Sequence, residues 1–184
     1  GIEGAILQMI NHGVTTGALF LCVGMIYERT HSRELKMAAG VGKYMPVFVT
    51  FLTFFALSSF AFPGTNSFVG EFMILAAVFE TNSFFANNLA LGLAAIPGAI
   101  LAAAYMLRMI QKIIWGGINN PDQSGLVDLN AREILTLSPF LIFVFWIGLA
   151  PGPFLELIHE SVTNLMLQFH TFQADASSVT LLRQ

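Results

Sequence analysis

The sequence is short of charged residues: only 10% of its 184 residues are Asp, Glu, Lys or Arg. Water-soluble domains carry about a quarter of such residues, whereas the hydrophobic fraction here is 55%. This balance excludes a water-soluble domain and predicts an integral membrane protein. The formal net charge of −3 also argues against a nucleic acid as a partner, because nucleic-acid binding relies on basic surfaces.

Cysteine is almost absent as well. The single copy, Cys22, lies within an apolar run, so the chain cannot form an internal disulfide and has no cysteine cluster for an iron–sulfur centre. The sequence also has no glycine-rich phosphate loop, no pair of histidines with haem-like spacing and no nucleophile beside a base. We therefore expect no redox or hydrolytic site, no metal site and no bound cofactor in this chain itself.

Long apolar runs are what the sequence does contain, and about 20 apolar residues suffice for a helix to cross a bilayer. We expect an all-α transmembrane domain over residues 1–152, with spans at about 5–27, 45–82, 89–114 and 133–150. Beyond it, apolar residues recur at helical spacing with polar residues on the other face. This pattern predicts an amphipathic helix and tail over residues 153–184, lying at the membrane interface.

The second span is interrupted in its middle by Pro63, Gly64 and Thr65. Proline removes a backbone donor and disrupts a helix, and glycine tolerates backbone angles that other residues avoid. Ser67 is suited to cap a new helix after the interruption. Each half is too short for a full crossing, so we expect one discontinuous helix. Such a break survives at membrane depth only where it is buried in protein or lines a wet cavity.

The basic residues support a single crossing by the interrupted span. Seven of the eight Lys and Arg fall at or near residues 28–44 and 115–132, and only Arg183 lies elsewhere. The positive-inside rule places both basic loops on the cytoplasmic side. They share a side only if residues 45–82 cross the membrane once.

Glu71, shortly after the break, is the main candidate for a functional residue. A charged side chain at membrane depth costs about 3 kcal/mol on insertion scales. Burial disfavours its ionised form whereas a helix N-terminus favours it. These opposing effects suit a carboxyl group that exchanges protons where water reaches it. The alternative is that Glu71 only caps a helix start near the interface.

His12 is the second candidate, with Thr15 and Thr16 one turn further along the first span. An unperturbed imidazole titrates at about pH 6.5, so the three side chains could form a hydrated relay for protons. The alternative is a buried histidine that is hydrogen bonded to a neighbouring helix. Gly13 and Gly17 form a G-x-x-x-G pair, which predicts close packing of this span on a neighbour.

Four runs carry a family resemblance: QMINHG at residues 8–13, GALFL at 17–21, YERTHSR at 27–33 and FPGTNSFVGEF at 62–72. They resemble the antiporter-like membrane subunits of the proton-translocating NADH:quinone oxidoreductase, respiratory complex I. The resemblance covers nearly the whole chain and is weakest after residue 152. The run at 27–33 is the most particular to one branch of that family.

This resemblance implies a fourteen-helix antiporter-like bundle with two inverted repeats, each containing one discontinuous helix. The chain would supply the last four transmembrane helices, with the discontinuity at Pro63 and Gly64, as the C-terminal part of a larger protein. Glu71 would take the position of the ionisable residue in the terminal proton half-channel. His12 would match a histidine on the central hydrophilic axis. The lysines and the glutamate of the earlier relay would lie upstream of Gly1.

The same resemblance implies a non-redox, proton-translocating subunit of an NADH dehydrogenase complex. NADH, FMN, iron–sulfur clusters and quinone would be bound by other subunits. The expected partners are neighbouring antiporter-like subunits of the membrane arm, the missing N-terminal part of the same protein and the lipid bilayer. The expected location is a bacterial inner membrane rather than a mitochondrial one. A subunit of a multi-subunit cation/proton antiporter is the first alternative, and a non-conducting structural membrane subunit is the second.

Overall fold

A computed structural model describes residues 1–80, 88–117 and 125–181. Over these residues the chain is helical, without strands: α1 (Ile2–Thr30), the 3₁₀ helix η1 (Val41–Lys43), α2 (Pro46–Ser59), α3 (Asn66–Glu80), α4 (Asn88–Trp115), α5 (Ala131–Leu149) and α6 (Gly152–Leu181). The predicted all-α fold class is thereby confirmed. Residues 81–82 of the predicted second span and 182–184 of the predicted tail lie outside the described part.

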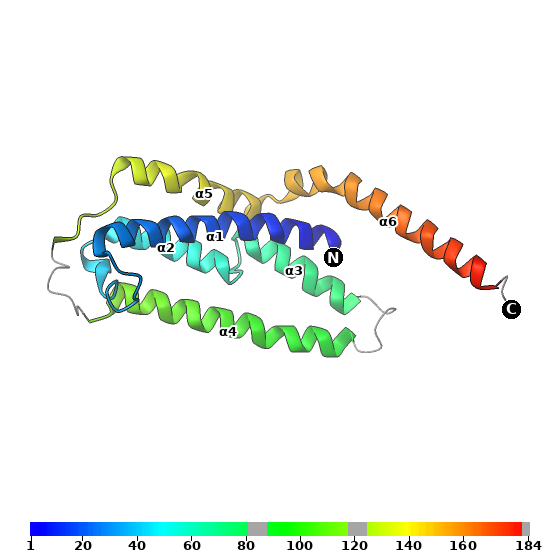
Figure 1. Cartoon of the computed structure of the whole chain (residues 1–184), viewed down its shortest axis with the longest axis horizontal. Coiled ribbons are helices and arrows are strands. Elements are labelled where there is room, and N and C mark those ends of the chain that lie inside the picture. The colour runs from blue at the N-terminus through cyan, green and yellow to red at the C-terminus, as the bar shows by residue number, and fades with distance from the viewer. Residues whose placement is uncertain (81–87, 118–124, 182–184) are drawn as a thin grey trace.

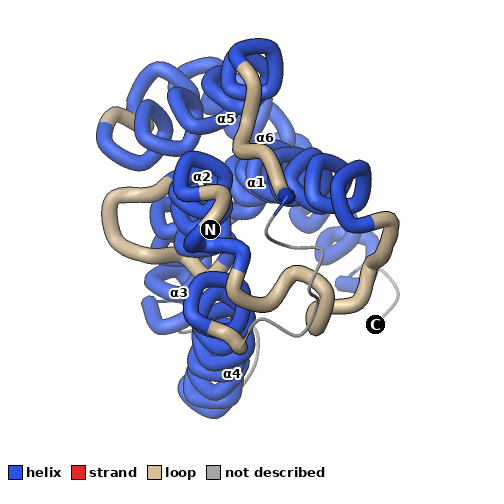
Figure 2. The backbone as a smooth tube through the Cα atoms, turned by 90° about the vertical axis from the view of Figure 1, so that its left-hand side faces the viewer, coloured by secondary structure: helices blue, strands red, loops and turns tan. Residues whose placement is uncertain are grey.

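Helices α1 to α5 run side by side along the long axis, and α6 projects beyond them at one end (Figure 1). Helices α2 and α3 follow one another along α1. A view along the bundle places α5 and α4 on opposite sides of this central layer (Figure 2). The two short helices therefore contact α1, α4 and α5. In the segment between them Thr65 is buried, whereas Phe62 and Pro63 are exposed.

Three of the described helices, α1, α4 and α5, are long and apolar enough to cross a membrane. Helix α2 has 14 residues and α3 has 15. A complete crossing needs about 20 residues, so neither helix is long enough to cross by itself. Residues 60–65, which are not helical, separate the two.

Helix α2 ends four residues before Pro63, at Ser59. Ala61 has a left-handed backbone (φ 57°), its N–H donates to the carbonyl of Ser58, and the Phe62 N–H donates to that of Leu57. This pair of bonds is a Schellman cap, which satisfies carbonyls that the helix end leaves free. Gly64 then turns the chain with φ 91°, a conformation that glycine adopts without strain.

The start of α2 is fixed by a residue far along the chain. Pro46 occupies the first turn, where its missing N–H is not needed. The carboxylate of Asp128 accepts hydrogen bonds from the N–H groups of Val47 (2.8 Å) and Phe48 (3.0 Å). The segment that precedes α5 therefore caps α2. Below this cap α2 buries its apolar face in the main core, to which α1, α4, α5 and the segments before α2 and α5 also contribute. The buried members of this core are Ala18, Cys22, Met25, Val41, Met45, Phe48, Val49, Leu52, Phe55, Ile113, Leu129, Leu137 and Val144.

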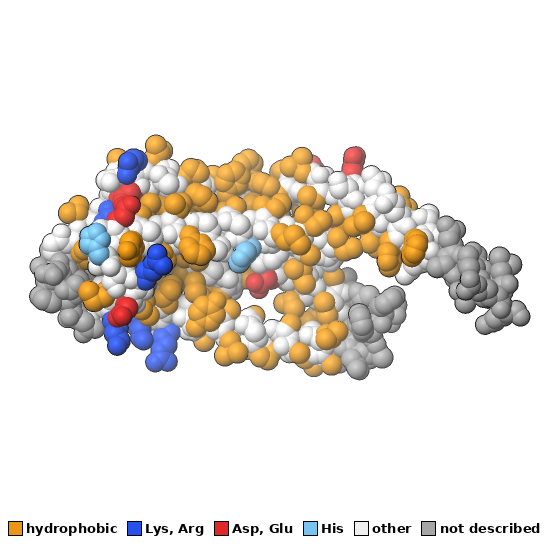
Figure 3. All heavy atoms as spheres, in the orientation of Figure 1, with side chains coloured by type: hydrophobic (Ala, Val, Ile, Leu, Met, Phe, Trp, Pro, Cys, Tyr) orange, Lys and Arg blue, Asp and Glu red, His pale blue; other side chains and the backbone are white. Residues whose placement is uncertain are grey.

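An ion pair joins the end of α1 to the start of α5. Arg29 donates to both carboxylate oxygens of Glu133, at 2.9 and 2.7 Å, and also to the carbonyls of Met25, Val127 and Asp128. The Arg29 and Glu133 side chains are only 15% and 9% exposed. Lys and Arg side chains gather at this same end of the bundle (Figure 3). The basic end of the bundle therefore also contains this ion pair.

Candidate functional site

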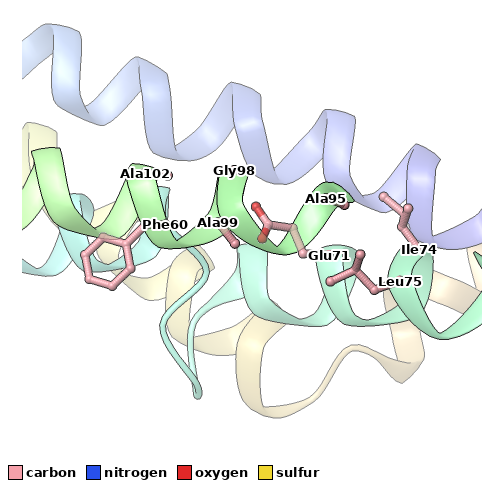
Figure 4. A pocket seen from close by; sticks show the side chains of 8 residues that line it. All are labelled: Phe60, Glu71, Ile74, Leu75, Ala95, Gly98, Ala99 and Ala102. Carbon is pink, nitrogen blue, oxygen red and sulfur yellow. The ribbon is translucent and has the colours of Figure 1, made fainter. Parts of the chain in front are cut away.

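Glu71 lies on α3, just after the segment between the two short helices, and its side chain is partly buried. It borders a cavity of about 280 Å³ between α3 and α4, and Figure 4 shows its carboxylate directed from α3 towards the turn of α4 with Gly98 and Ala99. The other lining residues are uncharged: Phe60, Ile74, Leu75, Ala95, Gly98, Ala99 and Ala102. Small α4 residues leave this space open, and Glu71 is the only lining side chain that can ionise.

The opposite side of Glu71 faces α1. Gln8 Nε2 lies 3.5 Å from Glu71 Oε1, and Gln8 Oε1 accepts a hydrogen bond of 3.3 Å from Asn11 Nδ2. Asn11 is fully buried, and its Nδ2 also donates to the backbone carbonyl of Asn66 at 2.8 Å. A line of polar groups therefore connects Glu71 with the first residue of α3.

The line continues into a buried cluster of four polar side chains at the interruption: Asn11, Thr15, Ser58 and Asn66. Thr15 Oγ1 and Ser58 Oγ lie 2.9 Å apart, and Ser58 Oγ donates to Asn66 Oδ1. Asn66 Nδ2 donates to the carbonyl of Asn11 at 3.3 Å. Side chains from three helices thus satisfy one another where the backbone between α2 and α3 is not helical, as buried polar groups require.

The structure separates the residues of the predicted histidine relay. Thr15 is buried in the polar cluster, whereas His12 lies on the exposed side of α1 and is within 3.3–3.4 Å of Thr16 Oγ1. No hydrogen bond joins His12 to Glu71 or to the cluster within the described residues. The three residues therefore belong to two different faces of α1.

The residues predicted to interrupt the second span fall between α2 and α3, and one expected cap needs correction. Pro63, Gly64 and Thr65 all fall in the non-helical segment, and Thr65 Oγ1 donates to the Phe62 carbonyl at 2.7 Å. The expected cap at Ser67 is wrong, because α3 already begins at Asn66 and Ser67 is within its first turn. Asn66 takes the cluster-forming role instead, since its amide can donate and accept at once.

Sequence reasoning did not select Gln8, Asn11, Ser58 or Asn66 as site residues. The signal for the first two was present, because Gln8, Asn11 and Thr15 are spaced by three and four residues and so share one face of a helix. Ser58 and Asn66 gave no such signal, since their contacts depend on how α2 and α3 meet. Within the described residues no group of His, Cys, Asp and Glu is arranged to hold a metal ion.

These features define a membrane protein of several helices with an ionisable group beside an interrupted helical path. Comparison with protein families identifies it further. A family described as "NADH:quinone oxidoreductase/Mrp antiporter, TM" matches residues 1–96. The chain belongs to this family, and the resemblance seen in the sequence is confirmed.

Curated relatives cover most of this chain. The NADH-ubiquinone oxidoreductase chain 4 of Marchantia polymorpha is 43% identical over 166 residues, which are 90% of this chain and 32% of the relative. The NADH-quinone oxidoreductase subunit M of Rickettsia typhi is 40% identical over 169 residues, 92% of this chain and 33% of the relative. The chain thus spans about a third of the length of these relatives.

A solved structure shares the fold. A chain of the respiratory complex I from Thermus thermophilus with bound NADH aligns with a TM-score of 0.73 and 28% sequence identity. The alignment covers 83% of this chain and 30% of that chain. Both the relatives and the solved structure therefore match most of this chain and are about three times as long.

Proposed function

We propose that this chain is the C-terminal part of a proton-translocating membrane-arm subunit of NADH:quinone oxidoreductase. Its helices would be the last four spans of a fourteen-helix bundle, in a transmembrane domain over 1–152 followed by the helix and tail of 153–184. Support comes from the family, from relatives named as subunits of this enzyme, and from the likeness to a complex I chain. Oxidation of NADH and reduction of quinone, with FMN and iron–sulfur clusters, would take place in other subunits.

The observation that carries the proposal is the position of Glu71. It is an ionisable residue next to an interrupted helix, with a cavity on its α4 side and polar side chains on its α1 side. Ionisable residues inside membrane segments commonly mark proton paths. We infer that α2 and α3 form one discontinuous crossing, and that Glu71 takes up and releases a proton as charges shift along the membrane arm.

The proposed path differs in detail from the one that the sequence predicts. Pro63, Gly64 and Thr65 lie in the non-helical segment after the end of α2, and Thr15 belongs to the cluster between α2 and α3. His12 and Thr16 lie on the outer face of α1, where they would meet the N-terminal part of the same protein or a neighbouring antiporter-like subunit. We propose that they pass protons across that contact rather than directly to Glu71.

The gathering of Lys and Arg at one end supports an orientation (Figure 3). Under the positive-inside rule this end faces the cytoplasm of a bacterium or the equivalent side of an organelle. We place the chain in a bacterial inner membrane, although relatives carry both bacterial and plant names. A multi-subunit cation/proton antiporter is the second candidate function, because the family description names both kinds of protein. Co-purification with flavin and iron–sulfur subunits decides between the two.

Glu71→Gln in the complete, assembled enzyme tests the role of the carboxyl group. The amide has nearly the same shape but does not exchange protons in the physiological range, so the number of protons pumped per NADH oxidised should fall. Glu34→Gln, at an exposed position in the segment after α1, is the matched control and should pump normally. Glu71→Asp keeps a carboxyl group and should retain pumping. A normal proton yield from a fully assembled Glu71→Gln enzyme would refute the proposal and favour a structural role.

A further inference from the structure

Gln8 occupies the space between Glu71 and the buried cluster. Its side chain amide has one contact on each side: Nε2 approaches Glu71 Oε1, and Oε1 accepts from Asn11. No other side chain in the described part of the chain forms a hydrogen bond or ion pair with Glu71. The charged and titratable groups of the packed helices, such as Glu3 and His12 on α1 and Arg108 on α4, do not line its cavity.

The close approach of α1 and α3 makes this contact possible. Gly70, the residue before Glu71, lies directly under Gln8: a Cβ atom there would be 3.0 Å from Gln8 Cβ and 3.1 Å from Gln8 Cα, and nearer still to its Oε1. Gly4, one turn earlier on α1, would place a Cβ atom 2.6 Å from Met73 Cβ. A side chain at either glycine would push the helices apart and remove Gln8 from Glu71.

The orientation of the Gln8 amide is determined by a backbone carbonyl. The carbonyl of Asn66 can only accept a hydrogen bond, so the side-chain nitrogen of Asn11 must face it. In this orientation Asn11 Oδ1 is buried without a hydrogen-bond partner in the described residues. The same nitrogen reaches Gln8, which must therefore present its oxygen to Asn11. The nitrogen of Gln8 is left to face Glu71, so Glu71 always receives a donor.

We propose that Gln8 is a positioning residue for Glu71, which keeps the ionised carboxylate against α1 and lowers its affinity for a proton. An N–H donor stabilises a carboxylate more than a neutral acid, because the hydrogen bond is assisted by the negative charge. The protonated acid gains less from Gln8, since it has a proton of its own to donate and Gln8 offers it no acceptor. The neutral side chain is thus held less firmly by Gln8 and can move further into the cavity that it already borders beside α4.

This inference rests on the proposed function of Glu71, and the test separates the two. Gln8→Met keeps the length of the side chain and removes the amide. Gly70→Ala leaves Gln8 and Glu71 unsubstituted, but its methyl group displaces the Gln8 side chain. Gln111→Met, at an exposed position on α4, is the matched control. Proton pumping by the assembled enzyme is measured against pH, together with the infrared band of the protonated carboxyl group.

Both variants should shift the pH profile of pumping upward by about 0.5–1 pH unit, the size expected for one long hydrogen bond. The pH at which the carboxyl band disappears should shift by the same amount. Gln111→Met should leave both unchanged. If Gln8→Met does not assemble, Asn11→Ala is measured in its place, because it removes the donor that orients Gln8 and should give a smaller shift in the same direction.

Unshifted profiles in Gln8→Met and Gly70→Ala, with Glu71→Gln impaired, would overturn the role of Gln8 alone. A normal proton yield in Glu71→Gln would instead overturn the proposed function on which the inference depends. A shift in Gln8→Met but not in Gly70→Ala would also count against it, because the contact itself would then not be the cause.

Discussion

Gly148 offers a direct test of how α5 supports the interruption between α2 and α3. A Cβ atom at Gly148 would lie 2.6 Å from the carbonyl carbon of Thr65 and 2.8 Å from that of Gly64, and closer still to the Gly64 oxygen. Ordinary contacts of a Cβ atom begin at 3.4 Å. Gly148→Ala therefore requires a separation of at least about 0.8 Å (3.4 − 2.6), and backbone atoms cannot rotate away as a side chain would.

Overpacking of this kind costs about 1–3 kcal/mol. Alanine is a better helix former than glycine by up to about 1 kcal/mol, so we expect a net loss of about 1–2 kcal/mol. For a domain of this size each kcal/mol lowers the melting midpoint by about 2–4 °C. The measurement is the midpoint of heat-induced loss of the assembled enzyme in detergent, read by size-exclusion chromatography.

Gly24→Ala is the matched control, because a Cβ atom at Gly24 would meet nothing within 4 Å. Its midpoint should equal that of the unmodified protein or exceed it slightly. If Gly148→Ala melts no earlier than Gly24→Ala, then α5 does not lie against the interruption as described. The contact between Gly148 and the backbone of Gly64 and Thr65 would then be refuted, whatever happens to proton pumping.

Two further predictions concern the basic end. Arg29→Met leaves the carboxylate of Glu133 buried without its partner and should lower the free energy of unfolding by about 3–5 kcal/mol. The double variant with Glu133→Gln should lose less stability than the sum of the two single changes, by more than about 1 kcal/mol. A double-mutant cycle on the same melting assay measures this, and additive effects would contradict a direct pair. Asp128→Asn keeps the size of the side chain but weakens the cap on α2, and should cost about 1 kcal/mol, whereas Glu34→Gln, at an exposed position, should melt normally. An Asp128→Asn protein as stable as this control would show that the cap is dispensable.

The helices were predictable from the sequence because hydropathy depends on each residue's own chemistry. The spans expected at 89–114 and 133–150 correspond to α4 (Asn88–Trp115) and α5 (Ala131–Leu149), within two residues at each end. Pro63 and Gly64 indicated the non-helical segment because their backbone preferences also depend on the residues themselves. The end of α2 at Ser59 was not predictable, because it depends on Ala61 adopting a left-handed conformation that alanine usually avoids.

Contacts between helices were less predictable, because they depend on which faces meet. The G-x-x-x-G pair predicted close packing at Gly13, yet a Cβ atom at that position would meet nothing within 4 Å of the described chain. Tight approaches occur instead at other glycines, among them Gly4, Gly70 and Gly148. In the same way, the spacing of Thr15 and Thr16 showed that both are on α1 but not that only Thr15 turns into the bundle.

The cap on α2 has a mechanical consequence. From Val47, which is bonded to Asp128, to Ser58 the helix rises by about 16 Å, at 1.5 Å per residue. A tilt of about 5° around its other end would thus move Ser58 by about 1.4 Å and break its bond to Asn66. Since α2 has no helical continuation into α3, this end of α2 is held by its packing in the core and by the buried cluster. The cap at Asp128 and the cluster at Ser58 therefore depend on the same placement of α2, although they lie at opposite ends of it.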